Sequence, residues 1–238
     1  METSGNKVSR DLNSERLILA IDTCGPSGSV ALGRLKGDSV EILCQIELEG
    51  RSYSSTLVAA VGDLLAQSGV ALRVLGAIVA VNGPGSFTGV RVGLSAVKGL
   101  AEPAQIPVVA VSRLEVLAAM AGVASAALDA HRHEVFLRLG EAERGRELLA
   151  GADELAAIAA PPRIAICDEA AALLLGSAWL AAELVHAPAP TAADALRLCA
   201  PRVLARDFVD LALLDGHYLR RSDAEIFGEP AAAPAERP

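Results

Sequence analysis

The feature that most constrains the fold is a glycine-rich stretch, Asn82-Gly-Pro-Gly-Ser-Phe-Thr-Gly-Val-Arg91. It follows an apolar run, Leu75–Val81, that predicts a buried strand. It precedes a segment reaching Leu100 whose apolar residues recur at the spacing of one helix face. Glycine permits positive φ or close backbone approach, so the stretch predicts a tight turn that lets a strand and a helix pack closely. The turn residues are Gly83, Pro84, Gly85, Ser86, Phe87, Thr88 and Gly89.

The same turn could instead hold an anion at the start of the helix, where Ser86 and Thr88 are natural caps. It lacks the GK[ST] sequence of a P-loop, however. Its GxGxxxG spacing, with Pro84 between the first two glycines, also misses the dinucleotide-binding fingerprint. From the residues alone, a packing turn and a ligand-binding turn remain equally open.

Composition limits the classes of function. The chain has 238 residues, 52% of them hydrophobic, enough for one domain or two small ones. Its net charge is −8 and no basic run is present, so tight RNA binding by this chain alone is not expected. No apolar run approaches the roughly 20 residues that span a bilayer, and we expect no membrane association.

Cysteine usage and the first residues indicate a cytoplasmic protein. The four cysteines are far apart, without a CxxC pair, which favours reduced thiols over a zinc site or a disulfide framework. Residues 1–16 are polar, so we expect a disordered leader there. They contain no apolar core of a secretory signal, which also favours the cytoplasm.

The first half of the chain predicts the order β-β-β-α-β-α-β, typical of a mixed sheet flanked by helices. We assign residues 17–111 to this first lobe. The expected strands are Leu17–Ile21, Ser29–Leu35, Val40–Leu48, Leu75–Val81 and Ile106–Val111, and the expected helices are Tyr53–Gln67 and Phe87–Leu100.

The second half, residues 112–228, predicts a shorter version of the same order: hairpin, helix, strand, helix. Residues 229–238, rich in Ala and Pro, predict a disordered tail. The expected elements are a helix from Ser112 to Ala121, strands Ala124–Leu128 and His133–Leu139, a charged turn Glu141–Arg146, a helix Ala152–Ala159, a strand Arg163–Cys167, and helices Glu169–Leu175 and Ala192–Ala205.

Two polar groups are candidates for chemistry. Asp22, followed by a Ser/Gly hairpin over 27–29, could be a catalytic carboxylate beside a phosphate-binding hairpin, although all these residues also favour ordinary turns. Asp129, His131 and His133 alternate, so an extended backbone would place them on one face, as in a metal site. Their position at a predicted hairpin tip favours simple exposure. No GxSxG or HExxH sequence supports a hydrolase.

The two first-lobe helices, rich in Ala, Gly and Val, have apolar residues beyond one stripe. This predicts either broad burial on the sheet or a second apolar face that binds another protein. Residues chosen as candidates for a partner interface are Tyr53, Leu57, Phe87, Arg91 and Val97.

Several segments, in order, resemble the TsaB (YeaZ) family of tRNA threonylcarbamoyladenosine biosynthesis proteins. GPGSFTG followed by Val-Arg-Val-Gly93 is highly specific, whereas the others are not when taken singly. The other matching segments are residues 17–23, Ser29-Val-Ala-Leu32, residues 106–112, Asp129-Ala130 with Glu134-Val-Phe136, and Tyr218-Leu-Arg220.

The resemblance implies the actin-like ATPase (ASKHA, ribonuclease H-like) fold, an α/β fold of two related lobes, here with the second lobe shortened. It also implies a non-catalytic subunit without a cofactor. Such a subunit forms a heterodimer with the transferase TsaD through the first-lobe helices, joins the ATPase TsaE, and meets tRNA only within the complex. Homodimers use a similar surface. TsaD binds metal through an HxxxH pair, whereas His131 and His133 are only two residues apart.

The sequence departs from the family pattern at two places, and two other functions remain possible beside the non-catalytic subunit. The family often has a histidine near the first helix, where this chain has Arg51-Ser-Tyr-Ser54, and commonly an arginine at the position of His131. The main alternative function is an ATP-dependent small-molecule kinase that uses Asp22 and the 27–29 hairpin. A peptidase is the third hypothesis, disfavoured by the missing metal ligands.

Overall fold

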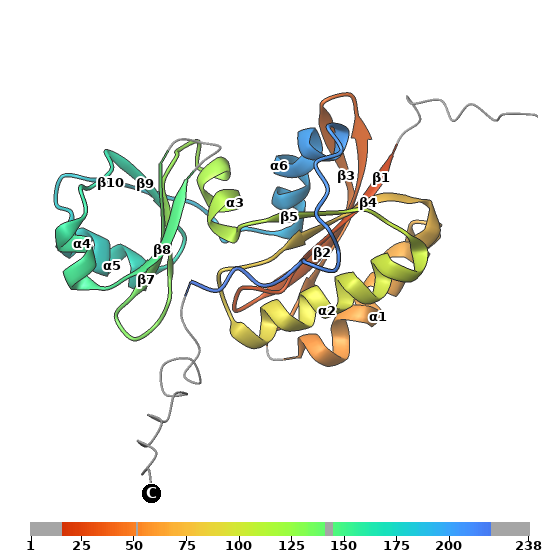
Figure 1. Ribbon diagram of the computed structural model, residues 1–238, viewed down its shortest axis with the longest axis horizontal. Helices are drawn as coiled ribbons and strands as arrows, with labels where there is room; N and C mark the ends of the chain where they lie inside the picture. Colours follow the sequence, from red (N-terminus) through yellow and green to blue (C-terminus); the bar gives the residue numbers. More distant parts are fainter. Residues whose placement is uncertain (1–15, 51, 141–144, 220–238) are drawn as a thin grey trace, which may run out of the picture.

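The computed structural model describes residues 16–50, 52–140 and 145–219, arranged as two lobes side by side (Figure 1). The predicted tail at 229–238 and nearly all of the predicted leader at 1–16 lie outside the described residues. Each lobe contains a five-stranded sheet with helices packed on it. This confirms the two-lobed actin-like α/β fold expected from the sequence.

The first sheet has the strand order β3-β2-β1-β4-β5. The pairs β1–β2 and β2–β3 are antiparallel, while β1–β4 and β4–β5 are parallel. Strands β1 and β4 lie inside this sheet, and their nearly continuous apolar sequence fits burial on both faces. All five strands predicted for this lobe are confirmed: β1 Leu17–Asp22, β2 Gly28–Lys36, β3 Ser39–Leu48, β4 Leu75–Val81 and β5 Val108–Val111.

Helices α1 (Tyr53–Gln67) and α2 (Phe87–Ala104) cover the outer face of the first sheet (Figure 1). A short 3-10 turn, η1 (Leu72–Val74), leads into β4. Helix α2 extends beyond the predicted end at Leu100, through Pro103, and stops where Gln105 adopts a left-handed conformation. Both predicted helices are therefore confirmed.

The second sheet repeats the first, with the order β10-β9-β6-β7-β8. Two of its strands were not predicted: β8 begins where a charged turn was expected, and β10 was missed. The second lobe is thus shortened in the length of its strands, which span four or five residues, and not in their number. Its elements are β6 Ala126–Asp129, β7 Val135–Leu139, β8 Arg146–Ala150, α4 Ala152–Ala157, β9 Arg163–Ile166, α5 Glu169–Ala178 and β10 Glu183–His186.

Helices α3 (Arg113–Met120) and α6 (Ala192–Leu204) lie between the two sheets (Figure 1). Helix α6 belongs to the predicted second lobe by sequence, yet its buried residues join the core of the first sheet. This corrects the division at 111/112: the first lobe is completed by a helix from the C-terminal part of the chain. None of the described helices is long and apolar enough to cross a membrane.

Candidate functional site at the glycine turn

The glycine turn packs against the residues that follow β1. Ser86 N donates a hydrogen bond to the Cys24 carbonyl at 2.8 Å, and the Thr23 hydroxyl donates to the Gly89 carbonyl at 2.7 Å. A Cβ added at Gly85 or Gly89 would lie 2.1 Å from the carbonyl oxygen of Cys24 or Thr23, respectively. These two glycines are therefore required for close backbone approach to the end of β1.

The turn also uses its own polar groups internally. Gly83 has φ of 116°, which favours glycine, and the Gly83–Pro84 peptide is cis. Ser86 caps α2 by accepting a hydrogen bond from Gly89 N at 3.3 Å, whereas Thr88 is exposed in the first turn. The geometry favours the packing interpretation of this turn over the phosphate-loop interpretation.

Asp22, the candidate catalytic carboxylate, is buried at the end of β1 and contacts two groups of the protein. Its Oδ1 accepts a hydrogen bond from Cys24 N at 2.8 Å, and its Oδ2 lies 3.5 Å from Nε of Arg113. Both side chains are buried, at 2% and 6% exposure. Burial opposes the charge of Arg113, but the Asp22 carboxylate, together with the nearby thiols of Cys24 and Cys167, raises the pKa of Arg113.

The hairpin after Asp22 is similarly engaged. Ser29 accepts a hydrogen bond from Ala192 N, at the start of α6, at 2.8 Å. A Cβ added at Gly25 would lie 2.5 Å from Nη2 of Arg113, so the guanidinium lies directly against this loop. Asp22 and Ser29, which the kinase alternative requires, are therefore committed to contacts within the chain, whereas Ser27 of the same hairpin is exposed.

The Asp129–His133 turn does not have the extended backbone that a metal site on one face would need. His131, Arg132 and His133 have φ of 59°, 55° and 61°, so the chain curls in the left-handed region. His131 Nδ1 lies 2.8 Å from Asp129 Oδ2 and its side chain is 85% exposed. Within the described ranges, no group of three His, Cys, Asp or Glu side chains is placed to hold a metal ion.

The predicted partner-interface residues separate into two sets. Tyr53, Leu57 and Val97 are buried in the first-lobe core, at 6%, 1% and 0% exposure. Charge introduced at Leu57 or Val97 would therefore disrupt folding and would not test partner binding. Phe87 is 44% exposed and Arg91 is also exposed, so both are accessible to a partner.

Sequence reasoning missed a polar cluster where the lobes meet, centred on Glu147 of β8. Its carboxylate accepts hydrogen bonds from the Ser112 hydroxyl at 2.7 Å and from Arg138 at 2.9 Å, and lies 2.9 Å from His217 Nε2. Burial alone would raise the pKa of Glu147, but the three hydrogen bonds together lower it. No local pattern indicated these residues, because Glu147 and His217 are 70 residues apart.

A second missed feature is an exposed aromatic–arginine cluster: Phe87, Arg91 and Tyr218. The Arg91 guanidinium lies 3.6 Å from the Phe87 ring centroid, and Arg91 Nε donates to the Tyr218 hydroxyl at 3.4 Å. The Phe87 and Tyr218 rings are 5.2 Å apart and tilted by 51°. Tyr218 belongs to a segment that was noted as a family resemblance but had no predicted role.

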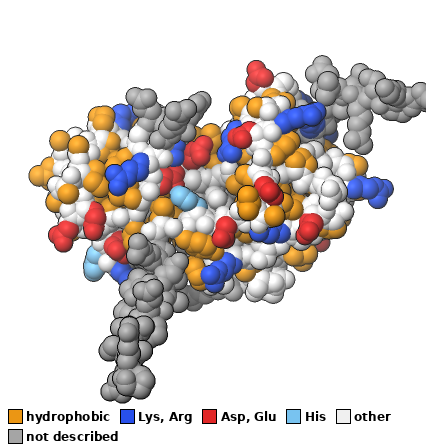
Figure 2. All heavy atoms as spheres, viewed as in Figure 1, with side chains coloured by type: hydrophobic (Ala, Val, Ile, Leu, Met, Phe, Trp, Pro, Cys, Tyr) orange, Lys and Arg blue, Asp and Glu red, His pale blue; other side chains and the backbone are white. Residues whose placement is uncertain are grey.

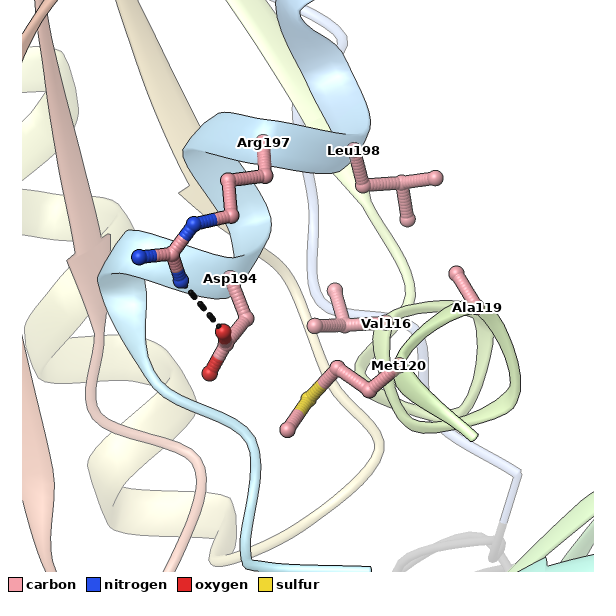
Figure 3. Close-up of a pocket in the computed structure, with 6 residues that line it drawn as sticks. All are labelled: Val116, Ala119, Met120, Asp194, Arg197 and Leu198. Atoms are coloured by element: carbon pink, nitrogen blue, oxygen red, sulfur yellow. Dashed lines mark hydrogen bonds and ion pairs between the residues drawn. The ribbon is translucent and has the colours of Figure 1, made fainter. Parts of the chain in front are cut away.

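A cleft of about 460 Å³ separates α3 from α6 (Figure 3). Val116, Ala119 and Met120 face it from α3, and Leu198 faces it from α6. The opening is bordered by the exposed ion pair between Arg197 and Asp194, at 2.8 Å. The cleft is thus mainly apolar and lies apart from the glycine turn.

The sequence comparisons match proteins of tRNA threonylcarbamoyladenosine biosynthesis. The family model described as TsaD, tRNA N6-adenosine threonylcarbamoyltransferase, matches residues 45–160. The tRNA threonylcarbamoyladenosine biosynthesis protein TsaB of Haemophilus influenzae is 37% identical over 125 residues, 50% of this chain and 51% of that protein. TsaB of Bacillus subtilis is 39% identical over 132 residues, 54% and 56% of the two chains. The chain therefore spans about half the length of the curated relatives it matches.

Solved structures extend the similarity across the fold. A crystal structure of a Pseudomonas aeruginosa protein with similarity to peptidase YeaZ has a TM-score of 0.67 and 30% identity. The match covers 86% of this chain and all of that chain. YeaZ from Pseudomonas aeruginosa gives a TM-score of 0.66 with 29% identity and the same coverage.

Proposed function

Because this chain belongs to the TsaB (YeaZ) family, we propose that it serves tRNA threonylcarbamoyladenosine biosynthesis as a non-catalytic subunit. In this proposal the chain binds a TsaD-type transferase subunit and activates it in the cytoplasm. Recruitment of a TsaE-type ATPase and homodimer formation in the absence of the transferase subunit belong to the same proposal.

The observation that carries the non-catalytic role is the state of Asp22. Its two carboxylate oxygens already face Cys24 N and the Arg113 guanidinium within the protein. A carboxylate that acts on a metal–nucleotide must be free to face that ligand, and opening this pair would leave a buried arginine without its counter-charge. We therefore favour an activating subunit over the kinase alternative.

The surface charge supports a role in which the transferase subunit makes most of the tRNA contacts. On the face drawn in Figure 2, basic side chains are scattered among acidic ones and form no large basic area. The net charge of the whole chain is −8. A protein that binds a nucleic-acid backbone directly usually concentrates lysine and arginine on one face.

The proposal is tested by measuring threonylcarbamoylation of tRNA with the purified transferase and ATPase partners, with and without this chain. We expect product formation to depend on this chain. Undiminished product in its absence would contradict the proposal. Calorimetry of the isolated chain with ATP and Mg²⁺ distinguishes the kinase alternative, which requires tight, stoichiometric binding.

A further inference from the structure

The segment 215–219 connects the second lobe with the start of α2. His217 N donates to the Asn82 carbonyl at 2.7 Å, and Asn82 Nδ2 donates to the Asp215 carbonyl at 3.4 Å. A Cβ added at Gly83 would lie 3.1 Å from the His217 carbonyl oxygen, so the segment passes directly over the glycine turn. The backbone of this segment is therefore fixed to the first residues of the turn.

The side chains of His217 and Tyr218 contact different lobes. His217 reaches Glu147 of the second sheet, and Tyr218 packs on Phe87 and Arg91 of α2. We propose that the aromatic–arginine cluster is part of the docking surface for the transferase subunit. We further propose that Glu147, through His217, is the positioning residue that holds Tyr218 in it. This inference rests on the proposed function.

The composition of the cluster supports docking. Phe87 and Tyr218, at 44% and 39% exposure, are the aromatic residues among the large exposed hydrophobic residues of the described chain, and their rings are in contact. Aromatic residues and arginine are enriched at protein interfaces and among the residues that dominate binding energy. Two members of the cluster, Phe87 and Arg91, lie near the start of α2. They are also the accessible members of the predicted interface.

The chemistry of the cluster indicates what the partner surface offers. Stacking on Phe87 holds the Arg91 guanidinium in one orientation, and such a guanidinium pairs best with a carboxylate. The two exposed rings require apolar side chains around that carboxylate. We therefore expect the transferase subunit to present an acidic residue surrounded by apolar ones.

Glu147 is suited to position the segment because it is itself held firmly. Ser112 and Arg138 bind its carboxylate independently of His217. A Cβ added at Gly216 would lie 2.5 Å from Cζ of Tyr218, so the ring packs closely over its own segment. A change at Glu147 is thus expected to reach Tyr218 through one intervening residue.

The test measures binding of the full chain to the purified transferase subunit by calorimetry. We expect Tyr218→Ala and Arg91→Ala to weaken binding at least about 10-fold, and Tyr218→Phe to stay within about twofold. Glu147→Gln should weaken binding about 3- to 10-fold, with no further loss in the Tyr218→Ala background, because both act through one contact. Leu213→Ala, at a position 79% exposed outside the cluster, is the matched control and should bind as the wild type does.

The outcomes separate the two proposals. Wild-type protein that fails to bind the transferase subunit contradicts the proposed function and this inference together. Wild-type binding with an undiminished affinity of Tyr218→Ala overturns the inference alone. Loss of self-association with intact transferase binding also overturns it, since the occupant would be a second copy.

If Tyr218→Ala does not fold, hydrogen exchange of wild-type residues 215–219 decides: exchange should slow at least about 10-fold in the complex, and unchanged exchange refutes the docking role.

Discussion

At the scale of single residues, Tyr53 shows how a partly polar side chain supports the buried end of β1. Its ring lies against Gly28, where an added Cβ would be 2.8 Å from Cε1, and its hydroxyl donates to the Gly25 carbonyl at 2.9 Å. Burial, and secondarily the Asp22 carboxylate, raises the pKa of Tyr53 to about 12. Tyr53 was a candidate for the partner interface, but in the structure it is buried and its hydroxyl holds the loop after β1.

This pKa predicts a specific loss of stability at alkaline pH. The unfolded tyrosine ionises near pH 10, so the contribution of Tyr53 is complete below about pH 10 and is lost as pH rises toward about 12. Tyr53→Phe should lower the free energy of unfolding by about 1 kcal/mol at pH 8, for the lost hydrogen bond, and by less at pH 11.5. Denaturant unfolding at both values checks this, with Tyr218→Phe as the exposed-site control. An equal difference at both pH values would refute the assignment.

At the scale of elements, the contact between α2 and the end of β1 determines where α2 begins. Gly85, Gly89 and Gly93 all face this contact, and a Cβ added at Gly93 would lie 2.3 Å from the Thr23 hydroxyl. Gly99 is in the same helix, with nothing within 4 Å of an added Cβ. The contact with the end of β1 therefore requires a glycine at position 93 of α2, whereas it places no such requirement on position 99 of the same helix.

We expect opposite effects from alanine at these two positions. Gly93→Ala should destabilise the protein by about 1–3 kcal/mol, because the new methyl group overlaps Thr23. Gly99→Ala should stabilise it by about 0.5–1 kcal/mol, because alanine restricts the unfolded chain and favours the helix. Chemical denaturation of both variants measures the two changes. Similar effects of the two substitutions would contradict the close-contact explanation.

The elements also show which features of the fold the sequence could predict. The strands β1, β2 and β4 are apolar, six to nine residues long and bounded by turns, so their pattern was sufficient. Strand β8 was missed because it starts with Arg146 and Glu147 in a charged run, and β10 because it is a four-residue edge strand, half-exposed at its centre. For the candidate site, the turn itself was predictable from the glycines. Its packing role was not, because the residues alone left packing and ligand binding equally open, and the contacts with Thr23 and Cys24 decide between them. The contacts of Arg113, Glu147 and Tyr218 were not, because they join residues distant in sequence.

At the scale of the whole molecule, the first lobe depends on a helix encoded after the second lobe. Residues of α6, including Leu196, Cys199 and Val203, are fully buried in the core that also contains β1 and β2. Gly33 of β2 packs closely on α6, since a Cβ there would lie 3.1 Å from Leu196 Cδ1. Without α6, one face of the first sheet would be exposed to water.

Fragments of the chain test this dependence. We expect a fragment of residues 1–111 to lack a cooperative unfolding transition, whereas residues 113–187, which contain the second sheet with α3, α4 and α5, should show one. In the full chain, Leu196→Ala should cost about 2–5 kcal/mol, as for other large-to-small changes in a core. Thermal unfolding followed by circular dichroism measures all three proteins. A 1–111 fragment that unfolds cooperatively at the temperature of the full chain would contradict the proposed dependence.

The position of α6 in the sequence also reverses the usual order of events during synthesis. Domains generally fold in the order in which they leave the ribosome, at about 5–20 residues per second. Here the second sheet and its helices are complete before α6 emerges, so the lobe made first is the lobe finished last. For on the order of 5 to 20 seconds the nascent chain presents an uncovered apolar sheet. We expect the growing chain to be prone to aggregation during that interval, although the finished protein buries this surface.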